Sequence, residues 1–354
     1  MRSAALIEVR RASGPRRPQT APWIDRHYAR VPRRLPFPRR GDAAARRRWR
    51  IALRGALRRI LGLAAFGRVP LPRPVVLAST RHAGYRRERI AYQTLPGNWV
   101  SAWLLVPDRR AGAARRPAVL CAHGHFPGGK RGVVDPRCAP GVAYGHEFAR
   151  RGCVVLAPDN AGMGERDVAL AERMSDDGSI TGCFLAWARL NHVGLDLTGL
   201  RVFELMAGVS LLAARDDVDP RAIGAAGLSG GCWLSQLLAA LDERVAGAVL
   251  SGFFTTFAQT VWHGHCVCHH PRGIGAICEL PDIAALIAPR PLFVESGRSD
   301  ARYPLEPAFG RVASAYRASG AAQALALDHY DGGHVFRGHA SIPWLVERLR
   351  GRGR

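Results

Sequence analysis

A serine flanked by glycines is the first feature of the sequence that could do chemistry. Gly227-Leu228-Ser229-Gly230-Gly231 follows the apolar run Ala222–Ala226 and opens an apolar stretch that ends at Leu241. A strand before this motif and a helix after it would make a nucleophile elbow, a sharp turn that lifts the serine hydroxyl above a sheet. Small neighbours are needed because larger side chains would clash in such a turn. We therefore predict that Ser229 is a nucleophile for acyl transfer.

A serine nucleophile needs a base and an acid that orients the base, and an elbow of this kind is followed by the acid and then by the histidine. The apolar run Pro291–Glu295 leads into a loop that contains Asp300. Glu295 is an alternative acid, but it lies at the end of the expected strand. Further along, His329-Tyr-Asp-Gly-Gly-His334 offers two histidines. The paired glycines favour His334 as the base, and we expect His329 to be structural.

A tetrahedral intermediate also requires two donors for its oxyanion. The backbone N–H of Gly230, directly after the serine, is the expected first donor. The second should come from the loop after the expected strand Ala118–Ala122, which reads His123-Gly124-His125. We predict the backbone N–H of His125 for this role and expect both histidine side chains to brace the loop.

The elements needed to position these residues can be read along the chain. Apolar runs predict core strands at Ala118–Ala122, Cys153–Ala157, Ala222–Ala226, Ala246–Leu250, Pro291–Glu295 and Ala322–Leu327. Helical stretches lie between most of them, at Gly145–Arg151, Leu200–Arg215, Gly230–Leu241 and Glu306–Ser319. Continuous apolar strands that alternate with helices indicate an α/β fold with a mostly parallel sheet covered on both faces. The ends of such strands meet at one edge, where ligands bind.

The chain is expected to divide into an extension, residues 1–116, and a catalytic domain, residues 117–354. The extension should hold a helix that begins after Asp42 and short strands at Val75–Thr80, Arg89–Thr94 and Val100–Val106, which would extend the sheet. Within the catalytic domain, residues 253–282 show no clear period and are expected to form a cap or a long loop.

These residues resemble the α/β-hydrolase superfamily, and within it the bacterial acetyl-xylan-esterase-type and dienelactone-hydrolase-like group. The resemblance extends to Asp159-Asn-Ala-Gly-Met-Gly164, to Asp282–Pro291 and to Asp25-Arg-His-Tyr28. It implies the α/β-hydrolase fold and a serine hydrolase that acts on esters. Motifs of this superfamily identify the fold and the triad well and the substrate poorly.

A run of histidines and cysteines, His263-Gly-His265-Cys266-Val-Cys268-His269-His270, raises the alternative of a zinc site. Two observations argue against it. Paired cysteines in structural zinc sites are usually separated by two to four residues, and this pair is separated by one. An extended segment would also place the histidines and the cysteines on opposite faces. We therefore expect no metal and no cofactor, and interpret the run as packing in the cap. The aromatic residues of the same segment indicate either an apolar lining of the site or packing within the cap; they are Trp262, Phe253, Phe254 and Phe257.

The net charge of +23 lies entirely in the extension, which holds 28 Arg against five acidic residues. Lys130 is the only lysine, so nearly all the basic residues are arginines. Such a composition is more typical of GC-rich coding than of a site selected to bind phosphate. Nucleic-acid binding is therefore not expected, although basic stripes can bind phosphate backbones. The sequence contains neither a signal-peptide core nor an apolar run long enough to cross a bilayer, so we expect a cytoplasmic protein with reduced cysteines that does not bind membranes.

The combined prediction is a carboxylic ester hydrolase that acts on small-molecule or carbohydrate esters through an acyl-enzyme on Ser229. Asp300 and His334 complete the triad, and Gly230 and His125 supply the oxyanion donors. Alternatives are a peptidase-like or dienelactone-type hydrolase on the same triad, a metal-dependent hydrolase, and a non-catalytic nucleic-acid-binding protein. The sequence does not determine the acyl group, the alcohol or the oligomeric state.

Overall fold

The computed structural model describes residues 20–108, 114–126, 128–138, 143–168, 181–261 and 265–352. Strands in this part of the chain are β1 Val75–His82, β2 Tyr85–Leu95, β3 Asn98–Pro107, β4 Arg116–Ala122, β5 Val154–Pro158, β6 Val218–Leu228, β7 Val245–Ser251, β8 Leu292–Gly297 and β9 Leu325–Tyr330. The α-helices are α2 Ala21–Arg30, α3 Ala43–Ile60, α4 Lys130–Val134, α5 Tyr144–Arg150, α6 Gly182–His192, α7 Leu197–Ala213, α8 Gly230–Leu241, α9 Phe257–Val261, α10 Leu280–Ala285, α11 Ala308–Ala318 and α12 Ser341–Arg352. Short 3₁₀ helices are η1 Leu63–Phe66, η2 Gly164–Arg166, η4 Val267–His269, η5 Ile274–Ala276 and η6 Ala322–Ala324.

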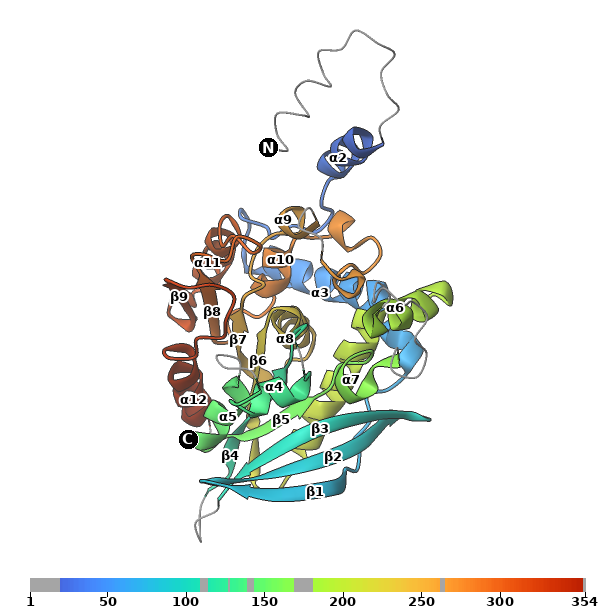
Figure 1. Cartoon of the computed structure of the whole chain (residues 1–354). Helices are drawn as coiled ribbons and strands as arrows, with labels where there is room; N and C mark the ends of the chain where they lie inside the picture. The colour runs from blue at the N-terminus through green and yellow to red at the C-terminus, as the bar shows by residue number, and fades with distance from the viewer. Residues whose placement is uncertain are drawn as a thin grey trace.

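All the strands join one sheet in the order β1-β2-β3-β5-β4-β6-β7-β8-β9 (Figure 1). The three N-terminal strands run antiparallel and join the edge at β5, whereas β5, β4 and β6 to β9 are parallel. The register aligns Leu228 with Ser251 and Ser251 with Glu295. The C-terminal ends of β6, β7 and β8 therefore meet at one edge of the sheet.

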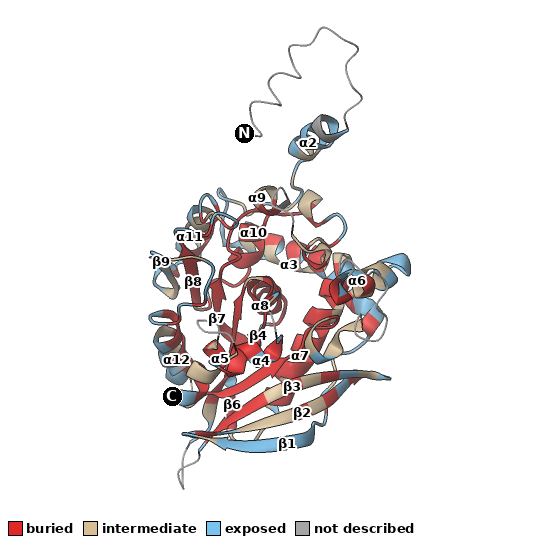
Figure 2. Cartoon of the chain, viewed as in Figure 1, coloured by how far each residue is buried: buried red, intermediate tan, exposed pale blue. Residues whose placement is uncertain are grey.

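Helices cover both faces of this sheet. Helices α7 and α8 pack on one face with α3 beyond α8, and α5 and α12 pack on the other. Strands β5, β7 and β8 are buried along their whole length, while β1 at the edge is almost entirely exposed (Figure 2). Continuous apolar sequence in the central strands is what burial on both faces requires. The prediction of an α/β fold with a mostly parallel, doubly covered sheet is confirmed.

Helix α3 carries much of the N-terminal arginine, and part of that charge is structural. The Asp42 carboxylate accepts a hydrogen bond from the Ala45 N–H at 2.7 Å and so caps the helix. Arg54 and Arg58 donate to the carbonyls of Ala240 and Leu241 at 3.0 and 2.9 Å. These carbonyls end α8, where the helix dipole favours positive charge. The guanidinium groups therefore anchor the extension to the helix that begins at the elbow.

One expectation about local structure needs correction. Residues 322–324 form the 3₁₀ helix η6, and the strand expected at Ala322–Leu327 begins only at Leu325 and continues to Tyr330. His329 therefore lies within β9. Residues 253–282, expected to form a cap or a long loop, contain α9, η4, η5 and the start of α10.

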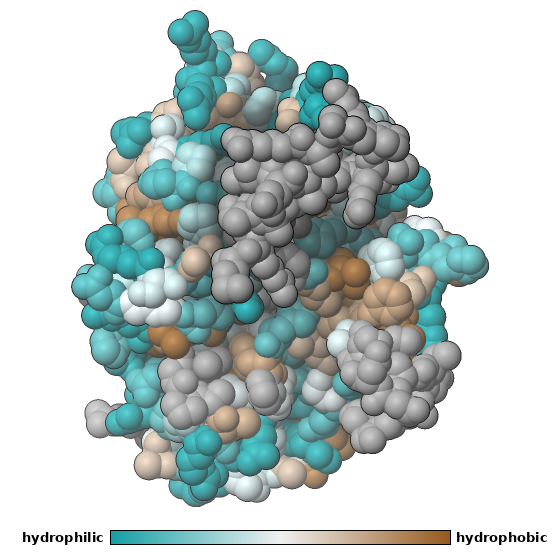
Figure 3. All heavy atoms as spheres, turned by 45° about the horizontal axis from the view of Figure 1, so that its top comes forward, coloured by the Kyte–Doolittle hydropathy of each residue, from teal (hydrophilic) through white to brown (hydrophobic). Residues whose placement is uncertain are grey.

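The helices and one face of the surface can be described by their apolar character. Among the described residues, no helix combines the length and the apolar character that a bilayer crossing requires. On the face drawn in Figure 3, the described residues are mainly hydrophilic, with hydrophobic ones in separate small patches. Scattered apolar residues of this kind are ordinary on protein surfaces.

Candidate active site

Ser229 occupies a strained turn between β6 and α8. Its φ of 60° and ψ of −124° make it the only non-glycine residue with positive φ in the described part of the chain. Such backbone strain costs about 1–3 kcal/mol and is concentrated at functional sites. The Ser229 N–H donates to the Ser251 carbonyl at 2.9 Å, which ties the turn to the end of β7. The turn holds the half-buried Ser229 at the edge where the parallel strands end.

The glycines of the motif are required by close backbone contacts. A Cβ atom on Gly227 would lie 2.2 Å from the Gly231 carbonyl oxygen, and one on Gly231 would lie 1.9 Å from the Ala122 oxygen. Both distances are far below van der Waals contact. The elbow therefore packs directly against the end of β4, where the turn His123–His125 begins.

Asp300 and His334 come together beside the elbow, each from a loop that follows a strand. The Nδ1 atom of His334 lies 2.6 Å from Oδ2 of Asp300, a charge-assisted distance. The Asp300 side chain is 5% exposed and that of His334 is 36% exposed. A Cβ atom on Gly252 would lie 2.9 Å from Cε1 of His334 and 2.8 Å from Cδ1 of Leu228. The imidazole and Leu228, the residue that precedes Ser229, therefore both lie beside Gly252.

Glu295, the alternative acid, points elsewhere. Its carboxylate accepts hydrogen bonds from the Gly338 N–H at 2.8 Å, the Arg337 N–H at 3.1 Å and the Ser341 hydroxyl at 2.6 Å. Burial raises the pKa of Glu295 above its ordinary value. The side chain thus holds the segment that follows His334, and in the described part of the chain it forms no hydrogen bond with the imidazole itself.

The turn His123–His125 lies against the serine. A Cβ atom on Gly124 would lie 2.6 Å from the Leu228 oxygen and 3.0 Å from the Ser229 Cβ. His123 is fully buried, and burial lowers its pKa to about 4, so the ring is neutral. Its Nε2 accepts the Asn160 N–H at 3.0 Å, which leaves the proton on Nδ1, 2.8 Å from the Gly124 oxygen.

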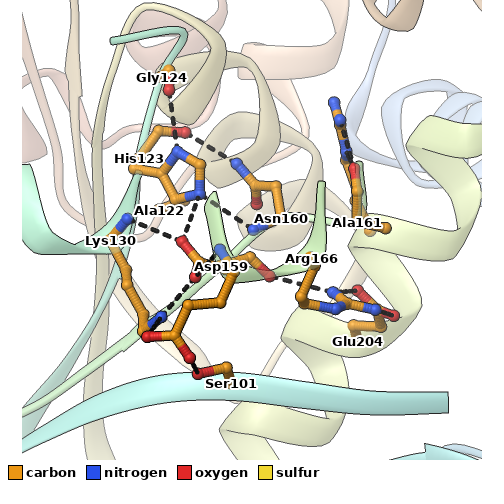
Figure 4. A network of polar contacts seen from close by, with 12 residues as sticks. Ser101, Ala122, His123, Gly124, Lys130, Asp159, Asn160, Ala161, Arg166 and Glu204 are labelled. Carbon is orange, nitrogen blue, oxygen red and sulfur yellow. Dashed lines mark hydrogen bonds and ion pairs between the residues drawn. The ribbon is translucent and has the colours of Figure 1, made fainter. Parts of the chain in front are cut away.

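A buried ionic network supports this turn (Figure 4). The Asp159 carboxylate accepts hydrogen bonds from the backbone N–H of Lys130, at 2.9 Å, and from its ammonium group. The same ammonium lies 2.9 Å from Glu165, which accepts from Ser101 at 2.7 Å. The Asn160 side chain donates to the His123 carbonyl at 2.9 Å. The motif that begins at Asp159 therefore braces the turn beside the serine.

Tyr303 is a site residue that the sequence analysis missed. Its ring stacks on that of His334, with centroids 5.1 Å apart, and its hydroxyl lies 3.3 Å from Nδ1 of His265. Burial raises the pKa of Tyr303 to about 12, so the hydroxyl stays protonated at neutral pH. Tyr303 follows Asp300 by three residues, and no motif marked it in the sequence.

The His/Cys run is arranged differently from the expected extended segment. Val267–His269 is the 3₁₀ helix η4, so Cys266 and Cys268 reach the same point instead of facing opposite sides. Two residues from distant segments, His125 and Cys183, join them there. Trp262 and His263 lie outside the described residues.

His269 takes a separate position, beside the elbow. It is buried, and its Nε2 lies 2.9 Å from where a Cβ on Gly230 would be. Its ring meets that of His125 edge-on at 4.9 Å. Neither of its ring nitrogens has a hydrogen-bond partner in the described part of the chain. Burial lowers its pKa well below the ordinary value, so the ring is neutral.

A cavity of about 1000 Å³ opens beside the turn. Its walls include the aromatic side chains of Trp103, Phe126 and Phe184 and the charged groups of Lys130 and Glu165. His125 and Cys266 also line it. The cavity therefore adjoins the elbow through His125, whose ring is next to Gly230.

Comparison with known proteins identifies the fold. Residues 40–200 match the model of the Abhydrolase family. YtaP, a candidate hydrolase of Bacillus subtilis (strain 168), is 24% identical over 58% of this chain and 67% of its own length. A candidate acetyl xylan esterase from Bacteroides fragilis NCTC 9343 superposes with a TM-score of 0.78 at 22% identity, over 94% of this chain and 95% of that one. A glucuronoyl esterase from Solibacter usitatus gives a TM-score of 0.57 at 13% identity, over 80% and 87%. The chain is therefore an α/β-hydrolase by fold.

Proposed function

We propose that the protein is a serine-dependent carboxylic ester hydrolase. The observation that carries the proposal is the Asp300–His334 pair, 2.6 Å apart, beside a strained Ser229 on an elbow between β6 and α8. The three residues occur in the order serine, acid, histidine that α/β-hydrolases use. Similarity to proteins named as esterases also supports the proposal.

In the proposed reaction, the Ser229 hydroxyl attacks the ester carbonyl carbon while Nε2 of His334 takes its proton. Asp300 keeps the other imidazole proton on Nδ1 and stabilises the imidazolium that forms. His334 then protonates the departing alcohol, which leaves an acyl-enzyme on Ser229. A water molecule gives a proton to His334 and attacks this ester; His334 then returns the proton to the serine oxygen as the acid leaves.

The backbone N–H groups of Gly230 and His125 are the proposed donors to the oxyanion. Gly230 begins α8, so its N–H has no acceptor within the helix, and the positive end of the helix dipole favours negative charge there. The turn that carries His125 lies against the Ser229 Cβ. The protonated hydroxyl of Tyr303 would stabilise the same charge from the side of His334.

The proposed substrates are short-chain esters of carbohydrates. Phe253, in the segment after β7, packs against His269 and Tyr303 with ring centroids 5.0 and 4.9 Å apart. This close ring packing favours a small acyl group such as acetyl. The adjoining cavity of about 1000 Å³, with three aromatic walls, would take a sugar on the alcohol side.

Hydrolysis of p-nitrophenyl esters from acetate to octanoate tests the proposal. Wild type should prefer the shortest chains, and Ser229→Ala should lower kcat by at least about 10³-fold. Ser235→Ala is the matched control, because Ser235 is a buried serine of the same helix whose hydroxyl has no partner in the described residues. Equal activity in the two variants would exclude Ser229 as the nucleophile. A profile that rises toward octanoate would exclude the small acyl site.

A further inference from the structure

Four soft ligand atoms converge between the elbow and the cap. They belong to His125 in the turn after β4, to Cys183 in the first turn of α6, and to Cys266 and Cys268 at η4. All four atoms lie within 4.8 Å of one another. Because three separate segments supply them, the cluster is a product of the tertiary fold and not of local sequence.

The distances fit a tetrahedral zinc ion. Bonds of about 2.3 Å to sulfur and about 2.0–2.1 Å to nitrogen, at tetrahedral angles, place a nitrogen and a sulfur ligand about 3.5 Å apart. Nε2 of His125 lies 3.5 Å from Sγ of Cys183 and 3.3 Å from Sγ of Cys268. These two nitrogen-to-sulfur distances therefore match the separation expected for two ligands of one zinc ion. Three cysteines and one histidine are a common ligand set of structural zinc sites.

Charge provides an independent argument for a bound cation. Arg201 in α7 is 2% exposed, and its guanidinium donates to Sγ of Cys183 at 3.0 Å and to the Ala161 carbonyl at 2.6 Å. In the described part of the chain it forms no ion pair with a carboxylate. A nearby negative group stabilises a buried guanidinium, and deprotonated cysteines would supply one here. Zn²⁺ with three thiolates and a neutral imidazole carries one negative charge, which Arg201 would balance.

We propose that His125, Cys183, Cys266 and Cys268 bind one Zn²⁺ ion. Four protein ligands complete the tetrahedron and leave no open position for a water molecule, so the site is structural and takes no direct part in ester hydrolysis. Its effect would be mechanical, because the ion ties η4 and α6 to the turn after β4. If the proposed function holds, the ion also holds the backbone of His125 beside Ser229, which makes the three cysteines positioning residues.

Metal analysis of the full-length, untagged chain tests the site without reference to activity. Protein produced with zinc in the medium should contain about one zinc per chain by mass spectrometry of the metal. X-ray absorption at the zinc edge should give three sulfur neighbours and one nitrogen. Replacement by Co²⁺ should produce a thiolate-to-cobalt charge-transfer band. Any of three results would overturn the proposal. They are less than about 0.1 zinc per chain together with the absence of a cobalt band, another metal in the site, and a ligand shell made of oxygen and nitrogen alone.

Single substitutions of the ligands test whether the metal is bound at these residues. Cys266→Ser removes a half-buried ligand and should lower the zinc content at least about tenfold, as should Cys183→Ser. Cys138→Ser is the matched control, because Cys138 is also half-buried but lies outside the cluster. If Cys183→Ser does not fold, the Cys266 variant and the wild-type X-ray absorption spectrum still show whether zinc is bound at these residues. Full zinc retention in Cys266→Ser would refute the assignment.

The role in positioning has its own readout. In Cys266→Ser, kcat for p-nitrophenyl acetate should fall at least about tenfold with KM little changed, because the oxyanion donor acts in the transition state. Ser229→Ala should lose activity and keep its zinc, so the failure of one proposal is distinguishable from that of the other. Unchanged kcat in zinc-free protein would refute the positioning role.

Discussion

Replacing Asp300 by Asn tests the central pair of the site with the smallest change of shape. The carboxylate lies 2.6 Å from Nδ1 of His334 and is 5% exposed, so the substitution removes a buried negative charge and keeps the volume. An amide can present its NH₂ group to the imidazole and so favour the tautomer with its proton on Nε2, which is the atom that must accept the serine proton.

The expected loss follows from the charge that His334 gains during the reaction. An imidazolium and a carboxylate with charge centres about 4 Å apart attract one another by about 4 kcal/mol at an effective dielectric constant near 20. Loss of that attraction in the transition state lowers kcat by about 10³-fold. The wrong tautomer adds to the effect, so we expect Asp300→Asn to lower kcat by about 10³–10⁴-fold.

The assay is p-nitrophenyl acetate hydrolysis at saturating substrate, with thermal unfolding measured on the same samples. Glu295→Gln is the matched control, since Glu295 is a second buried acid at the same sheet edge that binds the segment after His334. It should cost stability and lower kcat by less than about tenfold. If Asp300→Asn kept kcat within about tenfold of wild type, or if Glu295→Gln lost as much activity without unfolding, the assignment of the acid would be wrong.

Three further predictions concern stability, all measured by urea denaturation. Gly231→Ala should destabilise the fold by at least about 2 kcal/mol, because its Cβ would lie 1.9 Å from a carbonyl oxygen. Gly55→Ala, in the interior of α3, should instead stabilise the fold by about 0.5–1 kcal/mol. Equal effects of the two substitutions would show that a side chain at residue 231 does not clash. Lys130→Ala should cost about 3–5 kcal/mol by leaving the buried Asp159 carboxylate unpaired, and a cost below about 1 kcal/mol would show that water or rearrangement replaces the ion pair. Burial raises the pKa of Glu295, so the stability that its protonated form contributes is complete below the ordinary glutamate pKa and is lost as the pH rises through the pKa of the folded state. Between about pH 4 and pH 8, the free energy of unfolding should therefore fall less in Glu295→Gln than in wild type. Identical pH slopes for the two proteins would contradict this.

Local sequence rules determined most of the elements. The apolar runs predicted the core strands to within a few residues, except that η6 replaces the start of the last one. Asp42 marked the beginning of α3, and the glycines around Ser229 marked the elbow. These predictions succeed because capping, tight turns and burial on both faces of a sheet each constrain a few neighbouring residues. The acid and histidine were placed by the rule that strand ends meet at one edge, and the structure brings Asp300 to His334.

Only the tertiary structure decided which further residue lies at the candidate active site and which residues lie beside Cys266 and Cys268. Tyr303 stacks on His334 because of the path of the loop after β8, which no local pattern describes. Cys183 and His125 are 58 residues apart in sequence and yet lie 3.5 Å apart, sulfur to nitrogen. The sequence argument against zinc considered one segment in extended form, whereas η4 turns its two cysteines toward ligands from elsewhere. Ligand spacing along a chain reports a metal site only when one segment supplies the ligands, and here packing between three segments supplies them.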